Sequence, residues 1–190
     1  MFHEIQDLKY PVVVADGGDF VPALGDTHRA EIAEFLLNGM GAMAYDAIGV
    51  GELDLSMGPD YLRRAAKKLP LLGANVRFGP GLAESLQAVR WVERKGRRIA
   101  TLAVIDPILY YESPGALDRT DSVFVGDARL AIQATLQGLE LKPDLTVLLI
   151  HAERKRAEEI LEGMTGIDVV VIGHDPLGPQ GQFKIGDAYL

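Results

Sequence analysis

Three loops rich in glycine, acidic residues and histidine each follow directly on a run of apolar residues, and this pattern limits the folds open to the chain. They read Ala-Asp-Gly-Gly-Asp-Phe from Ala15, Ala-Ile-Gly-Val-Gly-Glu-Leu-Asp from Ala47, and Val-Ile-Gly-His-Asp-Pro from Val171. Short apolar runs of this kind predict buried strands. Each loop therefore begins where a strand ends, and in open α/β sheets this is where ligands bind.

Strand and helix signals alternate along the chain. Buried strands are predicted at 11–15, 45–49, 71–76, 145–150 and 167–172. Helices are predicted at 29–38, 56–68, 127–139 and 153–164, with Ser56 and Asp127 as caps. The apolar face of the first helix is expected to consist of Ile32, Phe35, Leu36 and Met40. The alternation favours an α/β layered fold with a mixed sheet.

Other segments have their own signals. A β-hairpin is predicted where 87–93 and 98–105 flank Lys95-Gly96, because glycine allows a positive φ. The segment 106–125 is expected to be a loop-rich connection, and 183–190 predicts the start of a further strand.

A chain of 190 residues fits one domain and can bury a substantial core. We therefore expect a single domain over residues 1–190. The first predicted strand comes almost at once, and nothing follows the last one. This suggests a domain excised from a longer protein, or one naturally shortened at both ends.

Composition excludes several classes of function. The net charge of −8 argues against a general binder of nucleic acid or of anionic membranes, because phosphate backbones need a basic surface. A small phosphorylated ligand stays possible, because a metal or backbone dipoles can hold it. The absence of cysteine excludes disulfides, thiolate metal sites and cysteine nucleophiles. No apolar run approaches the ~18 residues of a membrane span, and the first residues are not a signal peptide.

The order and flanks of the loops resemble the N-terminal domain of the 5'-nucleotidase branch of the calcineurin-like metallophosphoesterases. Gly18-Asp19 matches the Gly-Asp signature of that family at a strand end. The segment 49–54 stands in the place of Gly-Asn-His-Glu-Phe-Asp. His151 matches a separate histidine at a strand end, and Gly173-His174 matches the start of Gly-His-x-His. The resemblance covers about residues 11–176 and implies a metallophosphoesterase-like α/β sandwich.

Several functional positions of the family are changed in this chain. No Asp-x-His precedes Asp19. Val50 stands where the family has a metal-binding asparagine, and Gly51 stands where it has the catalytic histidine. Pro176 replaces the last metal ligand. The resemblance therefore implies that one of the two family metals has lost every ligand of its own, and no residue is carried over as catalytic.

The second metal keeps most of its ligands, and the resemblance implies a mononuclear site made of Asp19, His151 and His174. Two histidines and a carboxylate suit one zinc, manganese or iron ion, with water in the other positions. Each residue also has a simpler interpretation. Asp19 can be a turn carboxylate or a helix cap, and each histidine can bond a backbone carbonyl.

Three neighbouring polar residues are interpreted as structural. Asp54 matches the family aspartate that orients the missing histidine, so it is expected to lack that partner and to serve the start of a helix. Glu52 is interpreted as solvent-facing or as a structural acceptor. Asn75 is interpreted as a structural amide at a turn or strand end.

Three functions remain open at this point. The leading hypothesis is a divergent 5'-nucleotidase-like domain with little or no standard phosphoesterase activity that retains one metal. The second is an active phosphate-ester hydrolase whose missing elements lie outside this fragment, and the third is a non-enzymatic binding or scaffold domain. The resemblance further implies a nucleotide or small phosphorylated ligand. It also implies an exported, periplasmic parent protein whose signal lies outside this chain.

Overall fold

The computed structural model describes residues 12–23, 25, 27–112, 122–175, 184–185 and 188–189, with the backbone alone at 184–185. The helices are α2 (Arg29–Gly41), α3 (Glu52–Leu55), α4 (Gly58–Lys68), α5 (Pro107–Glu112), α6 (Ala128–Gln137) and α7 (Arg154–Leu161), with a 3₁₀ turn η1 (Pro80–Leu82). The strands are β1 (Ala15–Asp16), β2 (Ala47–Ile48), β3 (Val76–Phe78), β4 (Glu84–Ser85), β5 (Val89–Arg94), β6 (Arg97–Ile105), β7 (Val123–Val125), β8 (Leu145–His151), β9 (Val169–Gly173), β10 (Lys184–Ile185) and β11 (Ala188–Tyr189).

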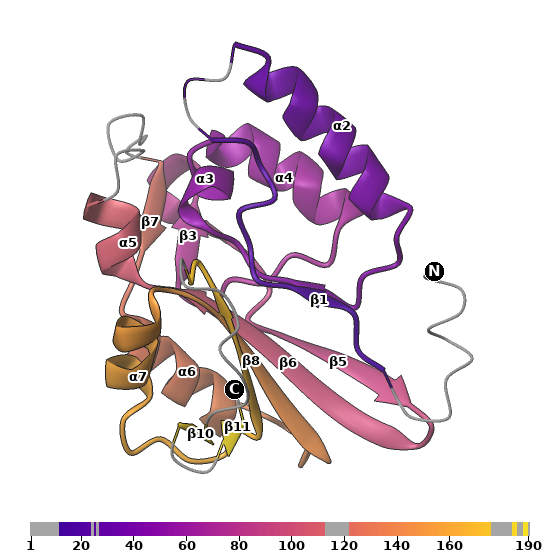
Figure 1. Ribbon diagram of the computed structural model, residues 1–190, viewed down its shortest axis with the longest axis vertical. Helices are drawn as coiled ribbons and strands as arrows, with labels where there is room; N and C mark the ends of the chain where they lie inside the picture. Colours follow the sequence, from indigo (N-terminus) through magenta and orange to yellow (C-terminus); the bar gives the residue numbers. More distant parts are fainter. Residues whose placement is uncertain are drawn as a thin grey trace.

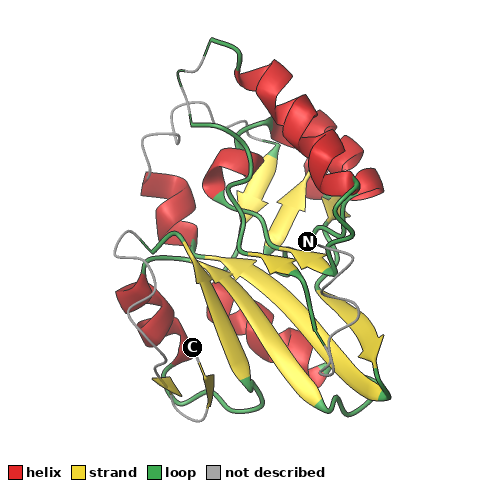
Figure 2. Cartoon of the chain, turned by 45° about the vertical axis from the view of Figure 1, so that its right-hand side comes forward, coloured by secondary structure: helices red, strands yellow, loops and turns green. Residues whose placement is uncertain are grey.

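The largest sheet is mixed and has the strand order β10-β11-β9-β8-β6-β5 (Figure 2). Its centre is parallel, because β8 pairs in that sense with both β6 and β9. Strand β5 is antiparallel to β6 and joined to it through Lys95 and Gly96, which both have positive φ. The predicted hairpin is therefore confirmed, and so is the predicted layered α/β fold with a mixed sheet.

The side chains of the central strands alternate between two faces of this sheet, as the period of a β-strand requires. On β8, Leu148 and Ile150 belong to the core shared with α6 and α7. Val147 and Leu149 belong instead to a core shared with Ala47 of β2. Helices α6 and α7 thus cover one face, and the β1–β2 pair lies over the other (Figure 1). Because both faces are buried, these strands appear in the sequence as continuous apolar runs.

Helices α2 and α4 form the outer layer beyond the β1–β2 pair (Figure 1). Leu37 of α2 and Leu62 of α4 lie in one core with Ile48 of β2. The predicted apolar face of α2 is wrong at Phe35, which is 76% exposed, whereas Ala33 and Leu37 are buried. The helix has apolar residues on most of its circumference, so the sequence alone left its rotation open.

The first half of the chain differs from the predictions at three boundaries. Of the strand predicted at 11–15, the described residues form a strand only at Ala15, where the two-residue strand β1 begins. The strand predicted at 71–76 is replaced by isolated bridges at Leu71 and Leu72, and β3 begins at Val76. Met57, not Ser56, precedes α4 as its cap residue. The Ser56 hydroxyl instead donates to the carbonyl of Leu53 and completes α3.

The second half agrees more closely. Asp127 caps α6 as predicted, its carboxylate accepting from the backbone N–H of Leu130. The connection 106–125 contains α5 and β7 in its described parts. The single strand expected at 183–190 is replaced by two short antiparallel strands, β10 and β11.

The topology brings four loops to one place. Strands β1 and β2 are parallel, with Asp16 opposite Ile48. Strands β8 and β9 are also parallel, with His151 opposite Gly173. The carboxyl ends of all four strands lie near the short helix α3 (Figure 1). Among the described residues, no helix is long and apolar enough to cross a membrane.

Candidate metal centre

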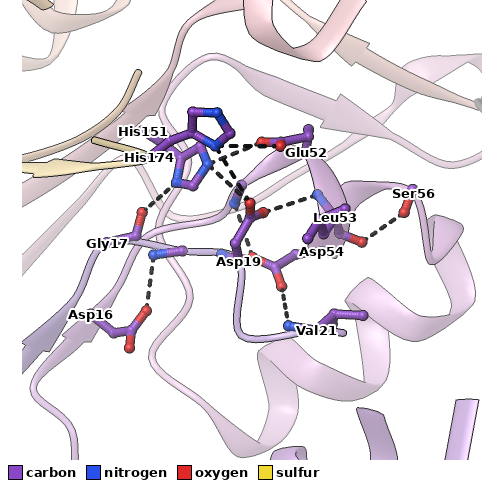
Figure 3. A network of polar contacts seen from close by, with 12 residues as sticks. Asp16, Gly17, Asp19, Val21, Glu52, Leu53, Asp54, Ser56, His151 and His174 are labelled. Carbon is purple, nitrogen blue, oxygen red and sulfur yellow. Dashed lines mark hydrogen bonds and ion pairs between the residues drawn. The ribbon is translucent and has the colours of Figure 1, made fainter. Parts of the chain in front are cut away.

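Four side chains that can ligate metal converge where these loops meet (Figure 3). Asp19 follows β1, Glu52 begins α3 after β2, His151 ends β8, and His174 follows β9. One donor atom from each lies within 4.8 Å of the donors of the other three. The structure thus brings together the three predicted site residues and adds a fourth, Glu52.

Glycines allow the loops to approach this closely. A Cβ atom on Gly18, whose φ is +100°, would lie 2.6 Å from the backbone nitrogen of Gly51. A Cβ atom on Gly173 would lie 2.5 Å from the carbonyl oxygen of Gly17. The loops therefore pack backbone against backbone, an approach that side chains at these positions would prevent.

Asp19 is held from both sides. Its backbone N–H donates to the Asp54 carboxylate at 2.8 Å, and its own Oδ1 accepts from the backbone N–H of Leu53 at 3.0 Å. The other oxygen, Oδ2, lies 3.4 Å from Nε2 of His151. The φ of Asp19 is 61°, an unfavourable value for a residue with a side chain, and surrounding contacts must maintain it. One Asp19 oxygen thus bonds the first turn of α3, a helix distant in sequence and not one that follows Gly17-Gly18, while the second oxygen faces the histidines.

His151 is only 2% exposed and is oriented by the backbone. Its Nδ1 lies 2.8 Å from the carbonyl of Gly17, so the hydrogen on this nitrogen donates to that oxygen. Its Nε2 then faces Glu52 at 3.0 Å and Asp19. A backbone carbonyl on the far ring nitrogen is the usual outer contact of a metal-binding histidine.

The surroundings of His151 favour a positive charge when no metal is bound. Burial alone would lower the pKa of the imidazole, but hydrogen bonds to Asp19 and Glu52, together with the carboxylate charge of Asp19, raise it to about 10. The cation and the two carboxylates satisfy one another. A metal bound at Nε2 would replace this proton.

His174 lies at the outer side of the cluster. Its side chain is 34% exposed, and its Nδ1 lies 3.5 Å from Oε1 of Glu52 and 3.9 Å from Oδ2 of Asp19. Its φ, like that of Asp19, is 61°. The two imidazole rings meet edge to face with their centres 5.4 Å apart, so His174 and His151 face the same pair of carboxylates.

The interpretation of Glu52 as a solvent-facing residue is wrong. Glu52 is 7% exposed, and both of its oxygens face histidines. A signal was present in the sequence, because Glu52 lies in the same kind of strand-end loop as the other three residues. Of the two interpretations made from the sequence, solvent-facing and structural acceptor, only the second agrees with this burial.

Asp54 has hydrogen-bond partners, although the histidine that the resemblance pairs with it is absent from this chain. Its fully buried carboxylate accepts from the backbone N–H groups of Gly51, Asp19 and Val21. Burial and the nearby Asp19 carboxylate raise its pKa to about 7, although the three N–H groups lower it. Asp54 therefore ties the loop after β1 to the start of α3, and Asn75 is likewise structural, with hydrogen bonds to Ile105 and Gly126.

Gly51, where the resemblance places a histidine, is closely surrounded by the side chains of the cluster. A Cβ atom on Gly51 would overlap the Asp19 carboxylate and would lie 2.6 Å from Cε1 of His151. Val50, in the asparagine position, is 2% exposed and belongs to the apolar core around α2 and α4. Pro176 lies outside the described residues.

A cavity of about 420 Å³ opens beside the cluster. Glu52 and His174 line it together with residues from α5, α7 and the loops next to them: Asp106, Ile108, Leu109, Glu112, Glu153 and Arg156. Arg156 is paired with Asp106 at 3.0 Å and with Glu159. The cluster is thus reachable by a small molecule.

The donor chemistry fits a divalent transition metal. Two imidazole nitrogens and two carboxylate oxygens suit zinc, manganese or iron. The outer contacts of His151 and Asp19 leave one donor atom of each free to face a common centre.

Comparisons with known proteins show which proteins this chain resembles. No family model matches the chain. A curated relative described as a probable 5'-nucleotidase of Treponema pallidum (strain Nichols) is 28% identical over 202 residues, covering 98% of this chain and 32% of the relative. The chain therefore spans about a third of the length of that protein.

Solved structures share the fold. The 5'-nucleotidase precursor from Thermus thermophilus has a TM-score of 0.73 at 20% identity, over 91% of this chain and 34% of that one. The calcineurin-like phosphoesterase YfkN from Bacillus subtilis has a TM-score of 0.69 at 16% identity, over 85% of this chain and 57% of that one. The predicted resemblance is confirmed: the chain is similar in sequence to a probable 5'-nucleotidase and shares its fold with the 5'-nucleotidase and calcineurin-like phosphoesterase structures.

Proposed function

We propose that this domain is a divergent metallophosphoesterase that binds one divalent metal through Asp19, His151 and His174 and has little or no standard phosphoesterase activity. The convergence of these side chains at the ends of β1, β8 and β9 carries the proposal. Zinc, manganese and iron are the metals that this set suits. Such a metal, once bound, supplies a positive charge that can orient and neutralise a phosphate oxygen.

Gly51 is the main reason to propose low activity. The family histidine at this position is absent, and the space for it is filled by Asp19 and His151. The loss of a positioned acid or electrostatic group typically costs on the order of 10² to 10⁴ in rate. Most of the polar side chains that line the cavity beside the cluster are carboxylates. The guanidinium of Arg156, which also lines this cavity, is already paired with Asp106.

The ligand proposed for the site is a nucleotide or another small phosphorylated molecule. The cavity beside His174 supports this, because a molecule placed there could reach a metal in the cluster. The name of the Treponema relative also supports a nucleotide. An exported parent protein is proposed by analogy with the Thermus relative, whose name describes it as a precursor.

Two alternatives make different predictions. An active hydrolase completed by elements outside this fragment would gain rate when the parent protein is tested in place of this chain. A non-enzymatic binding or scaffold domain would bind no metal and would leave every phosphate ester unchanged.

The test compares His151→Ala with His28→Ala. His28 is an exposed histidine that pairs with Glu31 on α2, so its replacement controls for the loss of an imidazole. We expect His151→Ala to weaken zinc and manganese binding by on the order of 10²-fold in calorimetric titrations, and His28→Ala to leave it unchanged. Equal affinity in the two variants would refute the proposed site. Turnover of nucleoside monophosphates or p-nitrophenyl phosphate near the rates of ordinary hydrolases would refute the proposed loss of activity.

A further inference from the structure

We propose that Glu52 is the fourth protein ligand of the metal, in place of the ligand that Val50 cannot supply. This inference rests on the proposed metal binding at Asp19, His151 and His174. It adds a residue that the resemblance does not provide, because the resemblance offers the position of Val50 and not that of Glu52.

The donor atoms of the cluster are spaced almost as ligands of one ion would be. Metal–ligand bonds of about 2.0–2.2 Å place the ligand atoms of a tetrahedron about 3.3–3.6 Å apart. Nε2 of His151 lies 3.0 Å from Oε2 of Glu52, and Nδ1 of His174 lies 3.5 Å from Oε1 of Glu52. The corresponding distances from Asp19 are 3.4 Å and 3.9 Å. Glu52 offers a different oxygen to each histidine, whereas Asp19 offers Oδ2 to both, and each carboxylate has one spacing inside the tetrahedral range and one about 0.3 Å outside it.

The Glu52 carboxylate is buried beside the two histidines. It is 7% exposed, and its partners among the described residues are the two histidines. A histidine nitrogen that binds a metal carries no proton, so it cannot donate to a carboxylate at the same time. With metal on both rings, Glu52 would remain as a buried charge without a donor, which is costly. Binding of Glu52 to the same metal removes that cost.

The local backbone places Glu52 within reach of the histidines. Glu52 is the first residue of α3, and Asp54 fixes this turn by accepting from the N–H of Gly51. Gly51 has no side chain between Glu52 and the histidines, whereas the side chain of Val50 is in the apolar core. Residue 52 is thus the position in this loop from which a carboxylate reaches His151 and His174.

Two carboxylates would balance the double charge of the metal. The occupied centre would then be formally neutral and would attract a phosphate dianion less than a centre with one carboxylate. The inference thus deepens the proposed function: with Glu52 as a ligand, the site would hold its metal through four side chains and would attract phosphate only weakly.

The experiment titrates Co²⁺ into the metal-free chain, into Glu52→Gln and into Glu112→Gln. Glu112 is an exposed glutamate that lines the same cavity, so its variant is the matched control. We expect Glu52→Gln to lose on the order of 10²-fold in affinity and to change the visible Co²⁺ spectrum, which reports coordination number. Glu112→Gln should behave as the unchanged chain does.

The outcomes separate the two proposals. If the unchanged chain binds Co²⁺ and Glu52→Gln binds it with the same affinity and spectrum, Glu52 is not a ligand and the three-residue site stands. If the unchanged chain binds no Co²⁺, the proposed function itself fails. Should circular dichroism show that Glu52→Gln does not fold, Glu52→Asp decides, because its carboxylate keeps the charge but is one methylene shorter. Unchanged affinity in that variant would also overturn the inference.

Discussion

Replacement of Gly51 by alanine is the sharpest perturbation of the site that the structure offers. The backbone at Gly51 has φ −110° and ψ −178°, which alanine adopts without strain. The added methyl group, however, would overlap the Asp19 carboxylate and press on the ring of His151. Both obstacles are side-chain ends, so they can move, and the cost falls on the geometry of the site more than on the fold.

The expected magnitude follows from the contacts that must change. When Asp19 moves, its hydrogen bond from the N–H of Leu53 is lost, at a cost of about 1.5–3 kcal/mol for a charged acceptor. Alanine returns about 0.4–1 kcal/mol by restricting the unfolded chain. We therefore expect a net destabilisation of about 0.5–2.6 kcal/mol and a loss of metal affinity of about 10–100-fold.

Gly39→Ala is the matched control. Gly39 lies inside α2 without a positive φ, and a Cβ atom there would meet no described atom within 4 Å outside its own helix. Its replacement should raise stability by about 0.5–1 kcal/mol, because alanine favours helix. Urea unfolding of the metal-free chain and zinc calorimetry would measure both variants. The reasoning is refuted if Gly51→Ala binds zinc as tightly as the unchanged chain and gains stability as Gly39→Ala does.

Three further predictions test the account of the site. Because the folded-state pKa values of Asp54 and His151 are raised to about 7 and about 10, the stability of the metal-free chain should fall as pH rises from 4 to 10; urea midpoints that rise with pH would contradict this. Gly18→Ala should destabilise the fold by several kcal/mol, more than Gly51→Ala, because its Cβ would meet backbone atoms at a φ of +100°; thermal melts that show an equal or smaller loss for Gly18→Ala would contradict this. Asn75→Ala should cost about 2–4 kcal/mol by removing buried hydrogen bonds to Ile105 and Gly126 while metal affinity stays the same; reduced affinity in calorimetry would show that Asn75 supports the metal.

The placement of Asp19, His151 and His174 could be predicted because it depends on simple features of the sequence. Buried parallel strands are continuous apolar runs, and their carboxyl ends share one edge of the fold. The motifs then specified which strand ends belong together. The hairpin at Lys95-Gly96 and the cap at Asp127 are equally local features, and both are present in the structure.

Other features depend on contacts between distant segments. Glu52 is buried because Gly51 leaves its path open and because His151 comes from a strand about a hundred residues away, and neither fact is visible in the loop itself. Phe35 is exposed because the nearly continuous apolar surface of α2 does not determine which side faces the core. Asp54 has partners because three backbone N–H groups from two loops converge on it.

The most direct test of the central claim is the metal content of the purified chain. The chain would be exposed to zinc and to manganese, freed of excess metal, and measured by mass spectrometry against protein concentration. The account predicts about one metal per chain, held by the cluster of Asp19, Glu52, His151 and His174. A chain that retains no metal after this treatment would contradict it.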